Sequence, residues 1–183
     1  MMQHKGQLTE MQRFVANVGI TASTLRNLGA KGFVQTARDF LARLDLSQLT
    51  LLEPSAYPKW LDCQTKSLME AFPIKDLWGP ARKSINIFMV MASLNRFTCA
   101  ANALDRLEYS LEVPLDSVVA GKLRTWGQER SLLADGSLPK WLSIRKLDRK
   151  TSDAYQKLAA TMAKELGIPR GRLDVALWEP LRE

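Results

Sequence analysis

The chain has 183 residues, of which 46% are hydrophobic, and its formal net charge is +7 at neutral pH. This length and composition suit one folded unit, built as a single domain or two small lobes, and do not favour a disordered chain. Two cysteines, Cys63 and Cys99, cannot supply the four thiolates of an iron–sulfur cluster, and a single histidine, His4, near the N-terminus excludes hydrolase sites that depend on histidine.

Membrane insertion is not expected. The most apolar segment, Ile85 to Ala92, is far shorter than the roughly 20 residues that a helix needs to cross a bilayer. The N-terminal residues Met1 to Lys5 are not followed by the apolar region of a secretion signal. We therefore expect a cytoplasmic protein with no membrane partner, associated with the nucleoid if it comes from a bacterium.

Apolar residues recur every three or four positions in most segments, which predicts an all-α fold. From Pro80 to about Ala101 they surround the helix axis, as in a central, buried helix. Three amphipathic helices are predicted before it: Leu8 to Gly19, Phe33 to Leu44, and Tyr57 to Phe72 with Ser55 as its cap.

The second half of the chain is predicted to hold three helices and one long loop. The loop contains Asp135-Gly136 and Pro139 and is long enough to be a candidate functional loop. The predicted elements in order are a short segment at 104–109, a helix at 117–126, the loop at 131–150, a helix at 152–166 closed by Gly167, and a last helix at 172–179.

Positive charge is concentrated in one part of the sequence. Positions 122 to 150 contain eight basic and three acidic residues, an excess of five positive charges, which favours a polyanionic partner. A solvated basic face is the alternative interpretation. The eight are Lys122, Arg124, Arg130, Lys140, Arg145, Lys146, Arg149 and Lys150.

A helix start with basic residues stands in the middle of the chain. Gly79 precedes Pro80. Proline at the first helical position fixes φ for the helix, and its missing N–H group would have no partner within the helix in any case. The unpaired N–H groups of the first turn, beside Arg82 and Lys83, form an anion site suited to a phosphate. Any helix that starts with proline and carries basic residues shares these features, so an ordinary helix start is the alternative.

A carboxylate occupies a second helix start, 33 positions after Lys83. Asp116 lies just before Ser117-Val118-Val119, where its side chain can accept N–H bonds from the next helix. An immobile carboxylate suits the stabilisation of a developing positive charge, such as that of a sugar whose glycosidic bond is breaking. An ordinary helix cap is the commoner role for such an aspartate.

The two segments together resemble the helix-hairpin-helix DNA glycosylases of the endonuclease III type. Leu77, Gly79, Arg82, Lys83, Ser84, Asn86 and the apolar residues at 87–89 follow the family's order, and 113–123 resembles its aspartate turn. The resemblance implies a two-lobed, all-α helix-hairpin-helix glycosylase-like fold over residues 1–183, with the hairpin at about 72–101 and the turn at about 113–126. Ala81 replaces the family's second glycine, Trp78 and Pro80 are unusual, and 95–111 resembles an insertion.

The resemblance also implies an activity, the excision of a damaged or modified base from double-stranded DNA. Asp116 would supply the fixed negative charge, and Lys83 would attack the sugar and form a Schiff base, giving an associated AP-lyase activity. The helix start and Arg82 disfavour positive charge on the Lys83 amine, which favours a nucleophile. A cation that contacts a phosphate is the alternative role for Lys83.

Other roles are assigned with less support from the residues themselves. In relatives the last helix approaches the base pocket, which suggests Trp178 and Asp174 there. No metal centre or iron–sulfur cluster is expected, although the hairpin could hold a monovalent cation, and the protein is expected to be a monomer. The expected DNA contacts are Trp78, Gly79, Ala81, Arg82, Lys83, Ser84, Lys122, Arg124, Arg145 and Lys146.

Two other functions fit the same residues. A noncatalytic helix-hairpin-helix module would bind the DNA backbone without releasing a base. An enzyme of another class could act on hypermodified bases or nucleotides. The sequence does not name the excised base, since an oxidised purine, a damaged pyrimidine or a modified base of phage DNA would all fit.

Overall fold

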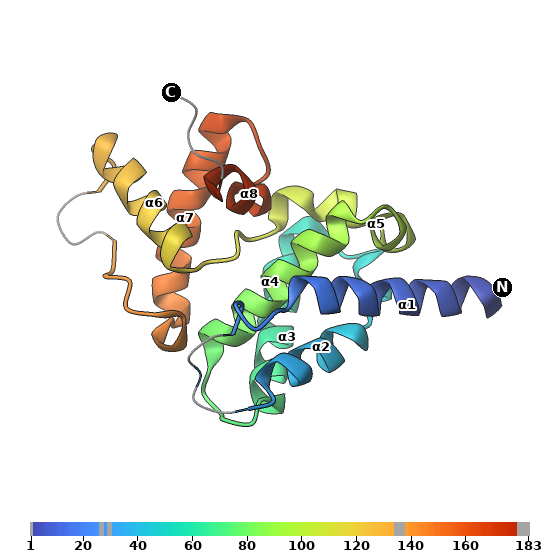
Figure 1. Cartoon of the computed structure of the whole chain (residues 1–183). Helices are drawn as coiled ribbons and strands as arrows, with labels where there is room; N and C mark the ends of the chain where they lie inside the picture. The colour runs from blue at the N-terminus through green and yellow to red at the C-terminus, as the bar shows by residue number, and fades with distance from the viewer. Residues whose placement is uncertain (1, 26–27, 29–30, 134–137, 179–183) are drawn as a thin grey trace.

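The computed structural model describes residues 2–25, 28, 31–133 and 138–178. The described residues form helices and loops with no β-strand among them, so the predicted all-α fold is confirmed (Figure 1). No described helix is long and apolar enough to span a membrane. The elements are α1 Met2–Gly19, α2 Phe33–Ala42, η1 Leu46–Leu49, η2 Pro54–Ala56, α3 Tyr57–Ala71, α4 Trp78–Leu94, α5 Arg96–Asn102, η3 Leu104–Ser110, α6 Ser117–Glu129, η4 Ile144–Lys146, α7 Arg149–Leu166, η5 Arg170–Arg172 and α8 Leu173–Trp178.

Helix α4 is the central helix of the fold. Ile85 and Phe88 are fully buried on one side of its axis and Val90 is buried on a nearly opposite side, as the apolar sequence predicted. It ends earlier than predicted, because the side chain of Asn95 accepts hydrogen bonds from the backbone N–H groups of Phe97 and Thr98 and so begins α5. The single helix predicted to reach about residue 101 is therefore two helices.

The other helix ends show which capping signals the fold uses. Gly167 adopts a left-handed conformation with φ of 66° and closes α7, as predicted. Asp148 caps the start of α7, three residues earlier than the predicted boundary. The predicted cap at Ser55 is wrong: a 3-10 turn, η2, leads directly into α3, whose N-cap residue is Ala56.

The described buried hydrophobic residues form two clusters. The first is built by α1 to α5 with η1 and η3, and the second by α6 to α8 with the half-buried Trp78 and Ile144 packed against it. Figure 1 shows these two groups of helices on either side of the extended segment 111–116. The first cluster ends at Leu111 and the second begins at Val113, so Glu112 lies between them.

Candidate active site

Lys83 and Asp116 meet between the two groups of helices. The Lys83 Nζ atom donates to Asp116 Oδ2 at 3.4 Å, and the side chains are 10% and 22% exposed. One residue belongs to α4 and the other to the start of α6, so only the tertiary fold brings them together. The pair is shielded enough to interact strongly and open enough to be reached from solvent.

Local structure holds the Asp116 carboxylate in place. Its Oδ1 atom accepts hydrogen bonds from the backbone N–H groups of Val118 at 2.9 Å and Val119 at 3.0 Å, so it is the N-cap of α6. The other carboxylate oxygen faces Lys83. The cap and the ion pair use different oxygens, and the negative charge is therefore fixed at the surface of α4.

Lys83 lies deeper in its helix than the sequence suggested. Helix α4 begins at Trp78 and not at Pro80, which puts Lys83 in the second turn. The effect of the helix dipole falls off within the first turn, so the expected influence of the dipole on the amine does not carry over to this position. The charged group that contacts the amine is Asp116.

Arg82 precedes Lys83, but its side chain turns into the protein and only 4% of the residue is exposed. Its Nε and Nη2 atoms donate to the two carboxylate oxygens of Glu112 at 2.9 and 2.8 Å. Burial disfavours the charged guanidinium, yet Glu112 and Asp62 outweigh burial and hold the pKa of Arg82 above its ordinary value. The predicted contact of Arg82 with DNA does not fit this arrangement, because the side-chain nitrogens of Arg82 already bind Glu112, Asp62 and Thr65.

The first turn of α4 is covered by the segment around η4. Gly79 is buried, and a Cβ atom there would lie 2.2 Å from the backbone oxygen of Ile144 and 2.7 Å from Leu147 Cβ. Glycine is needed at this position for close approach and not for contact with a ligand. The predicted phosphate contact at Gly79 does not fit this packing.

The neighbouring hairpin residues are also inside the protein. Ala81 and Ser84 are fully buried, and the Ser84 hydroxyl donates to the Pro80 carbonyl at 2.8 Å. Trp78 is half-buried and lies beside Arg82, whose guanidinium carbon is 5.3 Å from the ring centroid. Ala81 and Ser84 are therefore packing residues, which corrects their expected role as DNA contacts, whereas Trp78 is partly exposed and its contact with DNA stays a prediction.

The close approach at Gly79 has a measurable consequence. Gly79→Ala is expected to destabilise the fold by roughly 1–3 kcal/mol, because the backbone of η4 must move to admit the methyl group. The matched control is Gly121→Ala in α6, where nothing lies within 4 Å of the new Cβ, and where alanine should stabilise by roughly 0.5–1 kcal/mol. Urea denaturation of both variants measures the difference, and an unchanged Gly79→Ala midpoint would contradict the packing described.

The basic residues beyond position 120 divide into two kinds. Lys122 donates to the Leu177 carbonyl, and Arg124 donates to the Pro139 carbonyl at 2.7 Å, so both hold parts of the second group of helices together. Arg145 and Lys146 are exposed on η4, which packs on the start of α4. Of the four predicted DNA contacts in this region, Arg145 and Lys146 are the two exposed residues, and Arg145 also donates to the Leu28 carbonyl at 3.3 Å.

The remaining predictions concern the base pocket and metals. Asp174 is half-buried in α8, a helix that lies against α6, and the side chain of Trp178 falls outside the described side chains. Among the described residues, no group of three or more histidine, cysteine or acidic side chains could hold a metal ion. A groove of about 840 Å³ lies elsewhere, along α7, and includes Glu112, Asp153 and Arg170.

Sequence reasoning missed Glu112, which binds Arg82 and lies four positions before Asp116. The available signal was a single acid within the apolar run Leu111 to Leu115, because a charge in such a run is rarely buried without a partner.

The chain matches no protein-family model, and neither a curated protein nor a solved structure matches it. No relative therefore supplies a role for Lys83 or Asp116. The functional argument depends on the geometry of the pair and on the local resemblance of the two segments that carry it.

Proposed function

We propose that the chain is a DNA N-glycosylase that flips a damaged or modified base out of the duplex and breaks its glycosidic bond. The observation that carries the proposal is the contact between Lys83 Nζ and Asp116 Oδ2 at 3.4 Å. The resemblance required these two residues, 33 positions apart, to face one another. A glycosylase-like helix-hairpin-helix fold and binding to double-stranded DNA belong to the same proposal.

Asp116 and Lys83 have different roles in the proposed cleavage of the glycosidic bond. Asp116 provides a fixed negative charge beside a sugar that gains oxocarbenium character as the base departs with the bonding electron pair. In the bifunctional reaction Asp116 is placed to take a proton from the Lys83 ammonium group and to pass it to the departing nucleobase, so the carboxylate is negative again while the sugar carries positive charge. The neutral amine bonds to the anomeric carbon as the carbon–base bond breaks, and its nitrogen then loses a proton to the ring oxygen as the ring opens and a Schiff base forms.

DNA binding in this proposal depends on exposed cations near the start of α4. Removing Arg145 and Lys146 together by substitution with glutamine should weaken duplex binding and reduce its salt dependence. Each lost phosphate contact should lower the slope of log K against log salt by about 0.9. Equilibrium titrations at several salt concentrations measure this slope.

The control for that measurement removes two charges elsewhere. Arg130 directly follows α6 and Lys164 lies in the last turn of α7, and both are exposed. Their double substitution with glutamine should leave the slope unchanged. Equal effects of the two double variants would show that the protein's total charge, and not this surface, attracts DNA.

The proposed function is tested with a panel of duplex oligonucleotides, each carrying one lesion or modified base. Abasic sites should form in at least one of them, and heating in alkali converts each abasic site to a strand break that a gel resolves. If the protein binds every oligonucleotide of the panel but releases no base from any of them, it is a noncatalytic DNA-binding module. Release from free nucleotides in preference to duplex DNA would favour an enzyme of nucleotide metabolism.

A further inference from the structure

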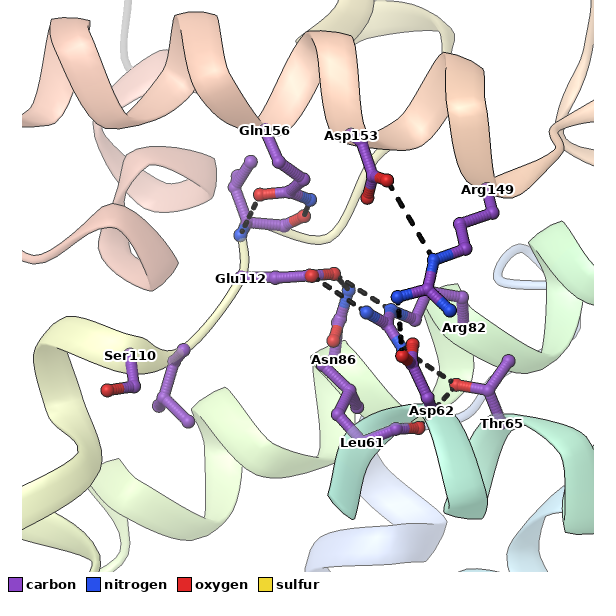
Figure 2. A network of polar contacts seen from close by, with 12 residues as sticks. Leu61, Asp62, Thr65, Arg82, Asn86, Ser110, Glu112, Arg149, Asp153 and Gln156 are labelled. Atoms are coloured by element: carbon purple, nitrogen blue, oxygen red, sulfur yellow. Dashed lines mark hydrogen bonds and ion pairs between the residues drawn. The ribbon is translucent and has the colours of Figure 1, made fainter. Parts of the chain in front are cut away.

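A buried polar network surrounds the side chain of Arg82 in α4 (Figure 2). The Arg82 guanidinium pairs with both oxygens of Glu112 and donates to Asp62 at 3.0 Å and to the Thr65 hydroxyl at 3.1 Å. Asn86, one turn further along α4, donates to the same carboxylate at 3.0 Å. Side chains from two neighbouring turns of α4 therefore hydrogen-bond to the Glu112 carboxylate.

Glu112 belongs to the extended segment that leads into Asp116. Further along this segment, Gln156 of α7 binds both backbone groups of Val113, accepting from its N–H at 3.2 Å and donating to its carbonyl at 2.8 Å. Arg170 donates to the Leu111 carbonyl at 3.0 Å. The segment is thus held by side chains from both groups of helices (Figure 2).

The register of this segment decides where Asp116 lies. An extended chain advances about 3.3 Å per residue, so a slip of one residue would displace Asp116 by a distance similar to the contact it makes with Lys83. Arg82 and Lys83 are consecutive, and consecutive helical side chains are about 100° apart. The face of α4 that holds Glu112 therefore fixes the direction in which Lys83 points.

We propose that Glu112, held by Arg82 and Asn86, is a positioning residue that sets Asp116 opposite Lys83. This inference rests on the proposed function, because the positioning matters only if Lys83 and Asp116 form the active site. The contact between Lys83 and Asp116 can nevertheless be measured in the absence of any activity. Glu112 does not touch the substrate in this proposal. It acts by fixing the segment that carries the carboxylate.

The test uses the double variant Arg82→Met/Glu112→Leu, which replaces the buried pair by apolar side chains of similar volume. Such replacements often leave a protein folded, because a buried ion pair adds little net stability. The matched control is Arg130→Met/Glu165→Leu, which removes a second arginine fork, with Nε and Nη2 of Arg130 on Glu165 at 2.9 and 2.6 Å. Circular dichroism and the thermal midpoint report whether each variant is folded.

The first readout is a zero-length crosslink. A water-soluble carbodiimide joins an amine and a carboxylate in contact as an amide, taking up the lost water as a urea, and peptide mass spectrometry detects the Lys83–Asp116 product. The crosslink should form in the unchanged protein and in the control. Its yield should fall at least tenfold in Arg82→Met/Glu112→Leu.

The second readout is the single-turnover rate of base release at saturating DNA. It should fall at least tenfold in Arg82→Met/Glu112→Leu, with DNA affinity changed less than twofold, because the DNA-facing surface is untouched. A loss of stability alone would lower the amount of active protein without changing this rate. If the double variant does not fold, Glu112→Gln, which leaves Arg82 paired with Asp62, is judged by the same two readouts.

The outcomes separate this inference from the proposed function. A folded variant that keeps both the crosslink and the rate overturns the positioning role, and so does absence of the crosslink in the unchanged protein. If no oligonucleotide is cut but the crosslink still depends on Glu112, the positioning role stands and the glycosylase proposal fails. If the protein is active and only the variant loses crosslink and rate, both stand.

Discussion

Replacing Asp116 with asparagine is expected to lower the rate of base excision about a hundredfold or more while leaving the protein folded. The amide oxygen can still accept the N–H bonds of Val118 and Val119, so the cap of α6 is kept. The negative charge beside the sugar is lost, and removal of one preorganised electrostatic group typically costs this much in rate. Duplex affinity should be similar or higher, because a negative charge has been removed from a DNA-facing site.

The measurement is single-turnover excision on the oligonucleotide found to be a substrate. The matched control is Asp148→Asn, since Asp148 also caps a helix, accepting from the Thr151 N–H at 2.7 Å, but at the exposed start of α7. That variant should keep full activity. An Asp116→Asn protein with an unchanged rate would show that Asp116 is only a helix cap.

If the proposed glycosylase activity holds, Lys83 decides between a monofunctional and a bifunctional enzyme, and its replacement is expected to give an all-or-none result. Borohydride added during turnover should trap a covalent protein–DNA adduct, because it reduces a Schiff base between the amine and the sugar. Lys83→Ala should abolish both the adduct and strand cleavage. Lys83→Arg keeps a cation that can pair with Asp116 and should restore DNA binding, but not trapping, since guanidinium is not a nucleophile at neutral pH.

Gel mobility of the reduced complex measures trapping, and Lys164→Ala, which removes an exposed amine in the last turn of α7, is the control that should still trap. Base release with no adduct in the unchanged protein would assign Lys83 to phosphate contact. Water would then be the nucleophile, with Asp116 assisting its attack. Equal trapping by Lys83→Ala would place the reacting amine elsewhere in the chain.

Local patterns in the sequence were enough to place most of the helices. Period-three and period-four apolar spacing predicted α1, α2, α6 and α7, and the apolar residues after Pro80 predicted the buried α4. Caps were predictable where one side chain or one glycine settles the geometry, as at Asp116 and Gly167. The break at Asn95 was missed because apolar residues continue on both sides of it.

The sequence by itself also determined that a lysine and a carboxylate stand near two helix starts, but not that they touch. Their contact depends on how the extended segment 111–116 crosses α4, and that path is set by buried partners distant in sequence, above all Arg82 with Glu112. The sequence also did not predict that the Arg82 side chain turns into the protein, or that the segment around η4 packs against Gly79. The sequence around a basic residue or a glycine at a helix start is the same whether that residue faces water or another segment of the chain. Only tertiary packing decides whether the residue is exposed or covered.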